Sequence, residues 1–388
     1  MHSHHSHSGQ FCSHAKDQLA DILERAHSLG FTHFHLSEHC PRQSADHLYP
    51  EEVEAGLSPI DLDKKFTAYI AHARSLQEVW KGKLNILVGC ETENLNTERE
   101  GDGDSLEFLS RRLESLSVRN GKLREGQPAG VGQDVIDYMV GSLHHVRGIP
   151  IDFDVAHFEK AVATFEEEAD KARLTPEQRQ DIGHARLILE YLDRQLELMQ
   201  RLRPEVIGHF DLFRLYRPDF PIKPDPQAPR SHLDGLLQDV WSRIERNVRY
   251  TCAYGALFEA NSASLRKGWE TGYPGVEILE SILSHGGRIC LSDDSHGIDY
   301  VALNYTRLKQ YLVLAGVEEI WYLEADPDGQ LTDKELLNAA EESVAARAAA
   351  PGPCKNAPVR FARGTIARKT DATWQDHACW SNIQLPVT

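Results

Sequence analysis

The sequence predicts an α/β protein: a TIM-like barrel of alternating strands and helices, with helical insertions and a C-terminal extension. Short apolar segments alternate with longer amphipathic segments along most of the chain, a pattern typical of a parallel sheet covered by helices. Seven or eight such units favour a barrel over an open sheet. Histidine and acidic residues also recur at the carboxyl ends of the predicted strands, where barrels of this kind carry their functional side chains.

The predicted elements follow one another in strand–helix order. The predicted strands are a short segment that ends near residue 7 and residues 31–37, 84–88, 135–140, 206–207, 256–260, 288–291 and 319–323. The predicted helices are residues 16–29, 62–80, 175–202, 233–250 and 275–284, with one more helix before residue 175 and one before residue 319. In the longest helix an apolar stripe of Ile188, Leu192, Leu196 and Met199 predicts contact with the core.

We expect one barrel domain over residues 1–344, interrupted by a polar, glycine-rich insertion at about residues 97–133. Residues 345–388 are rich in Ala, Pro, Gly, Arg and Lys and show no clear period, so we expect a solvated or loosely attached extension. The same segment is also a candidate to dock on the barrel or to mediate association.

Composition narrows the class of protein. The 388 residues include 42 Lys+Arg and 59 Asp+Glu, and the resulting net charge of −17 argues against a nucleic-acid partner. No apolar run reaches the ~20 residues that span a bilayer, and the opening residues do not resemble a secretory signal. Seven cysteines without a C-x-x-C pair favour a reducing compartment, so we expect a cytoplasmic monomer or homodimer.

Histidine is unusually frequent, with 20 residues in the chain. The opening Met1-His2-Ser3-His4-His5-Ser6-His7 resembles a purification tag, but its histidines do not form one block and no linker follows them. A strand would point His5 and His7 to the same side. We expect His2 and His4 to be solvated.

The residues at the predicted strand ends are ligands for Zn, Fe or Mn. They are His5, His7, His39, Glu91, His144, His209, Asp294 and His296. The set is too large for one ion, which takes about four or five ligands, and it suits two or three. Glu91 could bridge a pair of ions that activate a water, which predicts metal-assisted hydrolysis of a phosphate ester or an amide.

The ordered motifs resemble the PHP (polymerase and histidinol phosphatase) family over about residues 1–325. They are His5-Ser6-His7, His14, Ser37-Glu38-His39, Gly89-Cys90-Glu91, Ser142-Leu143-His144, Gly208-His209 and Asp294-Ser295-His296. The stretches MHSHHSHSG, LSEHCPR, VGSLHHVRGIPIDFD, IGHFDLFRLY, EANSASLRKGWETGYP and LSDDSHG are similar to its fungal and bacterial histidinol-phosphatase members.

The resemblance implies a distorted (β/α)7 TIM-like barrel and a centre of three metal ions, Zn or Fe with Mn as a further candidate. His5, His7 and Asp294 would hold the first ion, and Glu91 would bridge it to a second held by His144 and His209. His14, His39 and His296 would hold the third ion, and His14 is the least certain of these because its spacing from the first motif varies among relatives.

The implied reaction is hydrolysis of L-histidinol phosphate, with Glu91, Asp294 and His145 as catalytic residues. Arg266 and Arg214 would bind the phosphate, although either could instead form a surface salt bridge. His145 could contact the substrate, donate a proton to the leaving group or orient His144. Candidates for the ammonium and imidazole of the substrate are, by position only, Asp152, Asp154, Glu38 and Tyr49.

Three alternatives stay open at this level. The first is a PHP phosphoesterase with another phosphorylated substrate, and the second is an amidohydrolase-like enzyme that cleaves C–N bonds. The third is a metal-storage or regulatory protein that uses the His-rich start, and deletion of residues 1–4 should inactivate only this one. Cys12, Cys40 and Cys90 lie next to site motifs, and we expect them to be packing residues and not nucleophiles.

Overall fold

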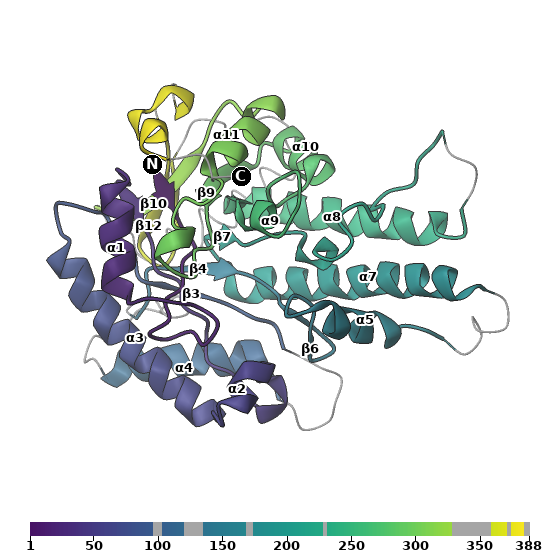
Figure 1. Cartoon of the computed structure of the whole chain (residues 1–388), viewed down its shortest axis with the longest axis horizontal. Coiled ribbons are helices and arrows are strands. Elements are labelled where there is room, and N and C mark those ends of the chain that lie inside the picture. The colour runs from purple at the N-terminus through teal and green to yellow at the C-terminus, as the bar shows by residue number, and fades with distance from the viewer. Residues whose placement is uncertain are drawn as a thin grey trace.

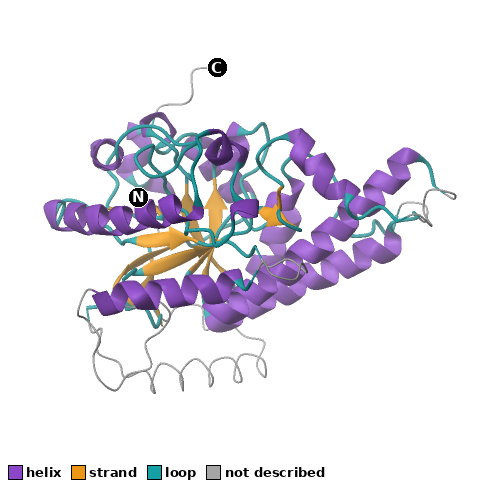
Figure 2. Ribbon diagram, turned by 90° about the horizontal axis from the view of Figure 1, so that it is seen from below, coloured by secondary structure: helices purple, strands orange, loops and turns teal. Residues whose placement is uncertain are grey.

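The computed structural model describes residues 1–95, 103–119, 135–167, 174–227, 231–327, 358–370 and 374–383. Strands lie in the interior of the molecule, and helices surround them (Figure 2). None of the helices in these ranges is both long enough and apolar enough to cross a membrane.

A parallel sheet of five strands forms the centre. In spatial order its strands are β3 (Gly89–Glu91), β4 (Tyr138–Gly141), β7 (Val206–Ile207), β8 (Leu257–Asn261) and β9 (Arg288–Ser292). These strands are buried throughout, as expected for a parallel sheet with helices on its faces. The prediction of an α/β protein with parallel strands is confirmed.

A second parallel pair, β1 (His2–Ser3) and β2 (His33–Phe34), lies beside this sheet. Single bridges join Leu36 to Val88 and His39 to Glu91, next to β3. At the other edge Ser6 forms a parallel bridge with Ser295, and the amide of His7 donates to the Ser295 carbonyl at 2.7 Å. The N-terminal segment therefore contacts the neighbourhood of both edge strands.

The helices cover the sheet and extend beyond it (Figure 1). They are α1 (Leu19–Ser28), α2 (Pro50–Glu54), α3 (Pro59–Val79), α4 (Ser105–Arg119), α5 (Val155–Ala163), α7 (Pro176–Leu202), α8 (Asp234–Tyr254), α9 (Ala263–Arg266), α10 (Val276–Ser284) and α11 (Tyr305–Leu314). The long helices α7 and α8 lie side by side and project from one side of the molecule.

Local sequence explains where α7 begins. Thr175 caps its N-terminus, its side chain accepts a hydrogen bond from the amide of Gln178, and the Gln178 side chain accepts from the amide of Thr175. Pro176 occupies the first turn, where its missing N–H costs no hydrogen bond. On the predicted stripe Ile188, Leu192 and Met199 are buried, and Leu196 packs against the core with partial exposure.

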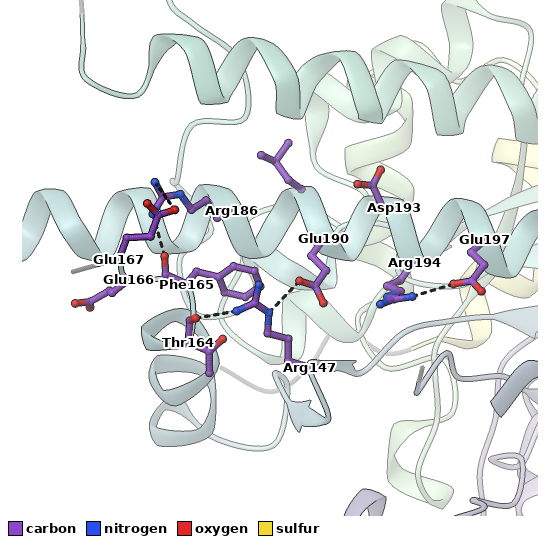
Figure 3. Close-up of a pocket in the computed structure, with 11 residues that line it drawn as sticks. Arg147, Thr164, Phe165, Glu166, Glu167, Arg186, Glu190, Asp193, Arg194 and Glu197 are labelled. Atoms are coloured by element: carbon purple, nitrogen blue, oxygen red, sulfur yellow. Dashed lines mark hydrogen bonds and ion pairs between the residues drawn. The ribbon is translucent and has the colours of Figure 1, made fainter. Parts of the chain in front are cut away.

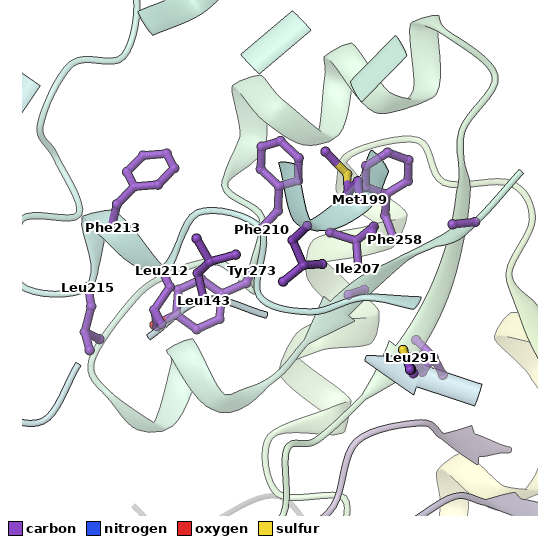
Figure 4. Close-up of a cluster of buried hydrophobic side chains, with 14 of the residues drawn as sticks. Leu143, Met199, Ile207, Phe210, Leu212, Phe213, Leu215, Phe258, Tyr273 and Leu291 are labelled. Carbon is purple, nitrogen blue, oxygen red and sulfur yellow. The ribbon is translucent and has the colours of Figure 1, made fainter. Parts of the chain in front are cut away.

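The main core lies between the sheet and the helices (Figure 4). Met199 of α7 meets Ile207 of β7 and Phe258 of β8 in this cluster, together with Phe210 from the loop after β7. Apolar side chains on both faces of the sheet explain why its strands read as short, continuous apolar runs.

Two parts of the chain that lack a clear sequence pattern contain regular structure. The expected insertion at residues 97–133 contains helix α4, of which Leu106, Leu109 and Leu113 are buried. Their spacing is helical, but glycine and charged residues around them hid the pattern. Residues 96–102 and 120–134 of this segment lie outside the described residues.

The described part of the C-terminal extension is docked on the rest of the fold, in a three-stranded sheet with β10. Strand β12 (Thr365–Lys369) pairs antiparallel with β10 (Trp321–Ala325) and with β11 (Val359–Arg360). Nη1 of buried Arg363 lies 2.7 Å and 2.8 Å from the two carboxylate oxygens of buried Glu205. Glu205 also accepts a hydrogen bond from the amide of Met139 in β4 at 2.9 Å. The ion pair of Arg363 with Glu205 therefore links the extension to the five-stranded sheet.

A short hairpin was not predicted. Its strands β5 (His145–Val146) and β6 (Ile149–Pro150) flank Arg147 and Gly148, which both have positive φ, 54° and 73°. This is the backbone of a tight two-residue hairpin turn, for which glycine is favoured. The hairpin holds His145 directly after the loop that follows β4.

Candidate metal centre

Glu91 lies at the centre of a ring of histidines. Its carboxylate is within 3.0–3.3 Å of a ring nitrogen from each of five of them. On Oε1 these are His5 Nε2, His144 Nε2 and His209 Nε2, each at 3.1 Å, and on Oε2 they are His7 Nε2 at 3.3 Å and His39 Nδ1 at 3.0 Å. Histidines from four separate segments of the chain therefore meet at one carboxylate.

The parallel sheet explains this convergence. Glu91 is the last residue of β3, His144 and His209 follow β4 and β7, and Asp294 follows β9. Since the carboxyl ends of parallel strands meet at one edge of the sheet, these side chains face a common space. The even and odd positions of the N-terminal strand face opposite ways, which puts His5 and His7 on the side of Glu91.

Asp294 and His296 complete this side of the ring. Oδ1 of Asp294 lies 3.6 Å from Nε2 of both His5 and His7, and Nδ1 of His296 donates to the backbone carbonyl of Asp294 at 2.9 Å. Asp294 has a φ of 47°, a left-handed conformation uncommon for a residue with a side chain. Such backbone strain persists where the surrounding structure fixes it, often at functional sites.

The charges in the ring are strongly coupled. Burial alone would raise the pKa of Glu91, but the imidazoles of His5, His144 and His39 hold it well below its usual value. Burial disfavours the charged imidazole of His5, yet Glu91 and Asp294 raise its pKa well above the ordinary value. The pKa of His7 is raised to about 9 because Glu38 and Glu91 outweigh its burial. The centre thus concentrates anionic oxygen and basic nitrogen in a space closed to solvent.

The donor set fits metal ions. Among the described residues, four groups place their ligand atoms within 4.8 Å of one another. The groups are His5, His7 and Glu91; His5, His209 and Asp294; His39, Glu91 and His144; and His7, Cys12, His39 and His296. Within the described part of the chain, His5 Nε2 and both ring nitrogens of His7 are buried without a hydrogen-bond partner, as expected of atoms that face an ion.

His14 lies at the edge of this assembly. Its Nε2 is 3.3 Å from Nε2 of His39, while its Nδ1 is 3.0 Å from Oε1 of Glu51. Its side chain is 36% exposed, and it belongs to none of the four groups found among the described residues. The structure brings the sulfur of Cys12 into the group where the sequence predicted His14.

Two further carboxylates were missed by the sequence analysis. Glu93 accepts from the amide of His144 at 2.8 Å, and its Oε2 lies 2.9 Å from Nδ1 of His144 and 3.1 Å from Nδ1 of His145. Burial opposes the charge, but these hydrogen bonds hold the pKa of Glu93 below its usual value. The carboxylate therefore keeps a proton on Nδ1 of both rings, so that Nε2 of each ring is the atom that would bind an ion or a substrate.

Glu259 of β8 plays the same part for the first motif. Its Oε1 lies 2.8 Å from Nδ1 of His5, and its Oε2 accepts from the amide of His209 at 2.7 Å. Signals for both carboxylates exist, since Glu93 follows Glu91 at the strand period of two and Glu259 is an acidic residue inside an apolar strand.

The two arginines predicted to bind phosphate differ in their surroundings. Arg214 is buried, so it does not form the surface salt bridge that was the alternative; its Nη1 is 3.8 Å from both Asp211 and Glu277. Its Nε and Nη1 have no hydrogen-bond partner among the described residues. Arg266 ends α9, directly after β8, with its guanidinium 4.3 Å from the ring centre of Tyr300.

One side of the ring is lined by aromatic residues. The ring centre of buried Tyr49 is 5.1 Å from that of His145 and 6.3 Å from that of Phe153. Nε2 of His145 is buried with no hydrogen-bond partner in the described residues, and so is Oδ1 of Asp152. Of the other predicted contacts to the organic part of a substrate, Asp154 instead caps α5, and Glu38 accepts from the amide and hydroxyl of Ser8.

His2 and His4 are buried, so the prediction that they are solvated was wrong. Together with His33 and His35 they form a second group of imidazoles, which we call the backbone-bonded cluster. The amides of Leu291, Leu323 and Leu87 donate to ring nitrogens of His2, His4 and His35, respectively. Deletion of residues 1–4 would remove this part of the core, so it does not separate a storage protein from an enzyme.

A cleft lined by charged residues lies elsewhere, along α7 (Figure 3). It has a volume of about 650 Å³, and its charged side chains form ion pairs, such as Arg147 with Glu190 and Arg194 with Glu197. None of the predicted site residues lines it. The cleft is therefore separate from the centre around Glu91.

The comparisons with known proteins agree with this geometry. The sequence model of the PHP domain family matches residues 3–263. The chain belongs to the PHP domain family. A probable histidinol-phosphatase of Schizosaccharomyces pombe is 38% identical over 85% of this chain and 92% of that relative. The histidinol-phosphatase of Saccharomyces cerevisiae is 29% identical over 87% of this chain and 96% of that protein.

The fold is also shared with a solved structure. A candidate histidinol phosphatase from Listeria monocytogenes superposes with a TM-score of 0.56 at 17% identity, covering 79% of this chain and 99% of that one. At this identity the likeness concerns the fold alone. The residues that form the centre around Glu91 extend beyond the matched range to Asp294 and His296.

Proposed function

We propose that this PHP-family chain is a metal-dependent phosphomonoesterase that hydrolyses L-histidinol phosphate to L-histidinol and phosphate in histidine biosynthesis. The observation that carries the proposal is the ring of five histidines around Glu91. Relatives named as histidinol-phosphatases match nearly the whole of their length to this chain, which supports this substrate over other phosphate esters.

The metal centre is proposed to hold three ions. His5, His7 and Asp294 would bind the first, and His144 and His209 the second, with Glu91 between them. His39 and His296 would bind the third with His14, which lies 3.3 Å from His39. Zinc or iron suits this mixture of imidazole and carboxylate, and manganese is a further candidate.

We also propose that the strands close as a distorted seven-stranded barrel around this centre. The bridges from Leu36 to Val88 and from Ser6 to Ser295 support closure, because they link the N-terminal strands to both edges of the five-stranded sheet. Closure would explain how residues as far apart in the sequence as His5 and Asp294 come to lie beside the same carboxylate.

Bound divalent ions at such a centre neutralise phosphoryl oxygens and lower the pKa of a coordinated water. The chain's own residues bind and orient the substrate. Arg266 and Arg214 would each present a planar guanidinium to the phosphoryl group. His145, with its Nδ1 proton held by Glu93, presents Nε2 to the site and could deliver a proton to the leaving oxygen of histidinol.

The organic part of the substrate is proposed to lie against the aromatic side of the centre. Asp152 offers a buried carboxylate oxygen for the ammonium group, and Tyr49 and Phe153 offer ring faces for the imidazole. A pocket of this chemistry would discriminate histidinol phosphate from esters that lack a positive charge and a ring.

The test is phosphate release by the zinc- or iron-loaded chain from histidinol phosphate and from a panel of other phosphomonoesters. We expect histidinol phosphate to have the highest kcat/KM by at least about tenfold, and Asp152→Asn to lower that preference more than it lowers the turnover of a neutral ester. Equal turnover of all esters would contradict the assignment of the substrate and leave a phosphoesterase of wider specificity.

A further inference from the structure

The sulfur of Cys12 lies inside the centre and not beside it. Its Sγ and one ring nitrogen from each of His7, His39 and His296 are all within 4.8 Å of one another. Cys12 is 7% exposed and forms no part of a disulfide. The sequence alone predicted a packing residue, but packing does not require a sulfur to face three imidazole nitrogens.

The loop that carries Cys12 is fixed at both ends. The amide of Cys12 donates to the Ser8 carbonyl at 2.9 Å, and the amide of Lys16 donates to the His296 carbonyl at 2.8 Å. Gly9 permits a close crossing, because a Cβ on Gly9 would lie 2.8 Å from the Cα of Lys16. These contacts fix the position of the sulfur relative to the loop that follows β9.

The sulfur is buried among groups that face a common space. Burial, and next the carboxylate of Glu38, raises the pKa of the Cys12 thiol well above its ordinary value, so the sulfur would give up its proton only to a bound cation. His7 is fully buried, and its ring nitrogens lie 3.3 Å from Glu91 and 3.6 Å from Glu38 without forming a hydrogen bond to any described residue. Buried ring nitrogens that stay unbonded beside carboxylates, a sulfur and two further imidazoles are consistent with a cation among them.

We propose that Cys12 is a further ligand of the third metal ion, in addition to the His14, His39 and His296 proposed above. The Sγ–metal bond forms as the thiol proton leaves to solvent, so one proton is released for each ion bound. A thiolate beside imidazoles favours zinc over manganese or magnesium at this one position, whereas the carboxylate-rich positions around Glu91 are less selective.

This inference rests on the proposed metal centre, but its test does not require phosphatase activity. Cobalt(II) replaces zinc at mixed sulfur–nitrogen sites, and a thiolate ligand adds a charge-transfer band in the near ultraviolet. The metal-free full-length chain is titrated with cobalt(II) to three equivalents, and its spectrum is compared with those of Cys12→Ser and Cys40→Ser. Cys40 is the matched control, because it is also buried and near the site but belongs to none of the ligand groups among the described residues.

We expect the charge-transfer band in the unaltered chain and in Cys40→Ser, and its loss in Cys12→Ser while the visible bands of the other cobalt ions remain. Cys12→Ser should also bind the last equivalent of zinc at least about tenfold more weakly. No charge-transfer band in the fully loaded unaltered chain would overturn the proposal, and so would a band that persists in Cys12→Ser.

The two proposals fail separately. A chain that hydrolyses histidinol phosphate without a thiolate–cobalt band refutes Cys12 as a ligand and leaves the enzyme assignment in place. A chain with the band and no phosphatase activity supports the ligand and refutes the assignment. Because the spectrum of the unaltered chain is itself decisive, the test stands even if Cys12→Ser folds poorly.

Discussion

The N-terminal strand supplies histidines to two regions that share a residue type and differ in chemistry. His5 and His7 face the carboxylates of Glu91 and Asp294, whereas His2 and His4 face peptide groups of β9 and β10 in the backbone-bonded cluster. Both pairs are buried. The chain thus directs alternate side chains of one strand into a candidate metal centre and into structural packing.

Burial disfavours the charged form of the histidines in both regions, and the neighbouring groups decide whether this effect is reversed. Carboxylates overcome burial and raise the pKa of His5 and, to about 9, of His7. Burial lowers the pKa of His33 to about 3 and of His35 to about 4, and peptide partners do not offset it. His39 and His296 belong to the centre and still have lowered pKa values, because after burial their strongest neighbour is the imidazole of His7. The pKa of a buried histidine therefore depends on which groups surround its ring.

The comparison predicts, first, that loss of Glu91 disables the centre and spares the backbone-bonded cluster. Glu91→Ala should lower kcat/KM for histidinol phosphate by more than about 100-fold, because one carboxylate contacts five proposed ligands. Kinetic assays and metal content measured by mass spectrometry check this. Full activity in Glu91→Ala, with metal retained, would contradict the bridging role.

Glu93 should matter less, because it acts through His144 and His145 and is not a proposed ligand. Glu93→Ala should weaken metal binding and kcat/KM by about 10- to 100-fold, and Glu93→Gln should recover part of both by accepting one hydrogen bond. Competition with a chelator gives the metal affinity. The matched control is Glu190→Ala, which removes only the partner of Arg147 in the cleft of Figure 3 and should leave both quantities unchanged.

In the backbone-bonded cluster, a change should affect stability and not metal binding. His4→Ala would leave the amide of Leu323 buried without its acceptor, which costs about 1–3 kcal/mol in the free energy of unfolding, before any cavity is counted. Denaturant unfolding measures the loss, and metal content per folded molecule should stay constant. A variant of unchanged stability that loses metal would assign His4 to the centre instead.

The same cluster should make stability depend on pH. The folded protein keeps His35 neutral down to about pH 4, whereas the unfolded chain binds this proton near pH 6.5, so the unfolded state holds more protons between these values. The contribution of His35 is complete above pH 6.5 and is lost as the pH falls toward 4, at up to about 1.4 kcal/mol per pH unit. His35→Gln should flatten this slope in unfolding measurements, and an unchanged slope would show that His35 is not the group responsible.

Sequence alone predicted the α/β class and most of the residues that gather around Glu91, because strand ends are marked by a change from apolar runs to His, Glu and Asp. It missed Glu93 and Glu259, because the spacing of Glu93 from Glu91 and the place of Glu259 in an apolar strand do not show which histidine ring each carboxylate orients. It also assigned His2 and His4 to solvent. The sequence does not show that backbone amides of distant strands donate hydrogen bonds to their ring nitrogens.

The extension shows the same limit on a larger scale. Arg363 lies in a segment of low regularity, and only its pairing with Glu205 reveals that residues 358–370 belong to the folded core. A long-range pairing of β12 with β10 leaves no local pattern in the sequence beyond a few apolar residues.

The central claim, that Glu91 lies among metal ions, is tested most directly by anomalous diffraction from crystals of the zinc-loaded chain. The account predicts peaks on both sides of the Glu91 carboxylate, one within bonding distance of His5 and one within bonding distance of His144. A fully loaded crystal of an active chain, with no anomalous peak near Glu91, would contradict it.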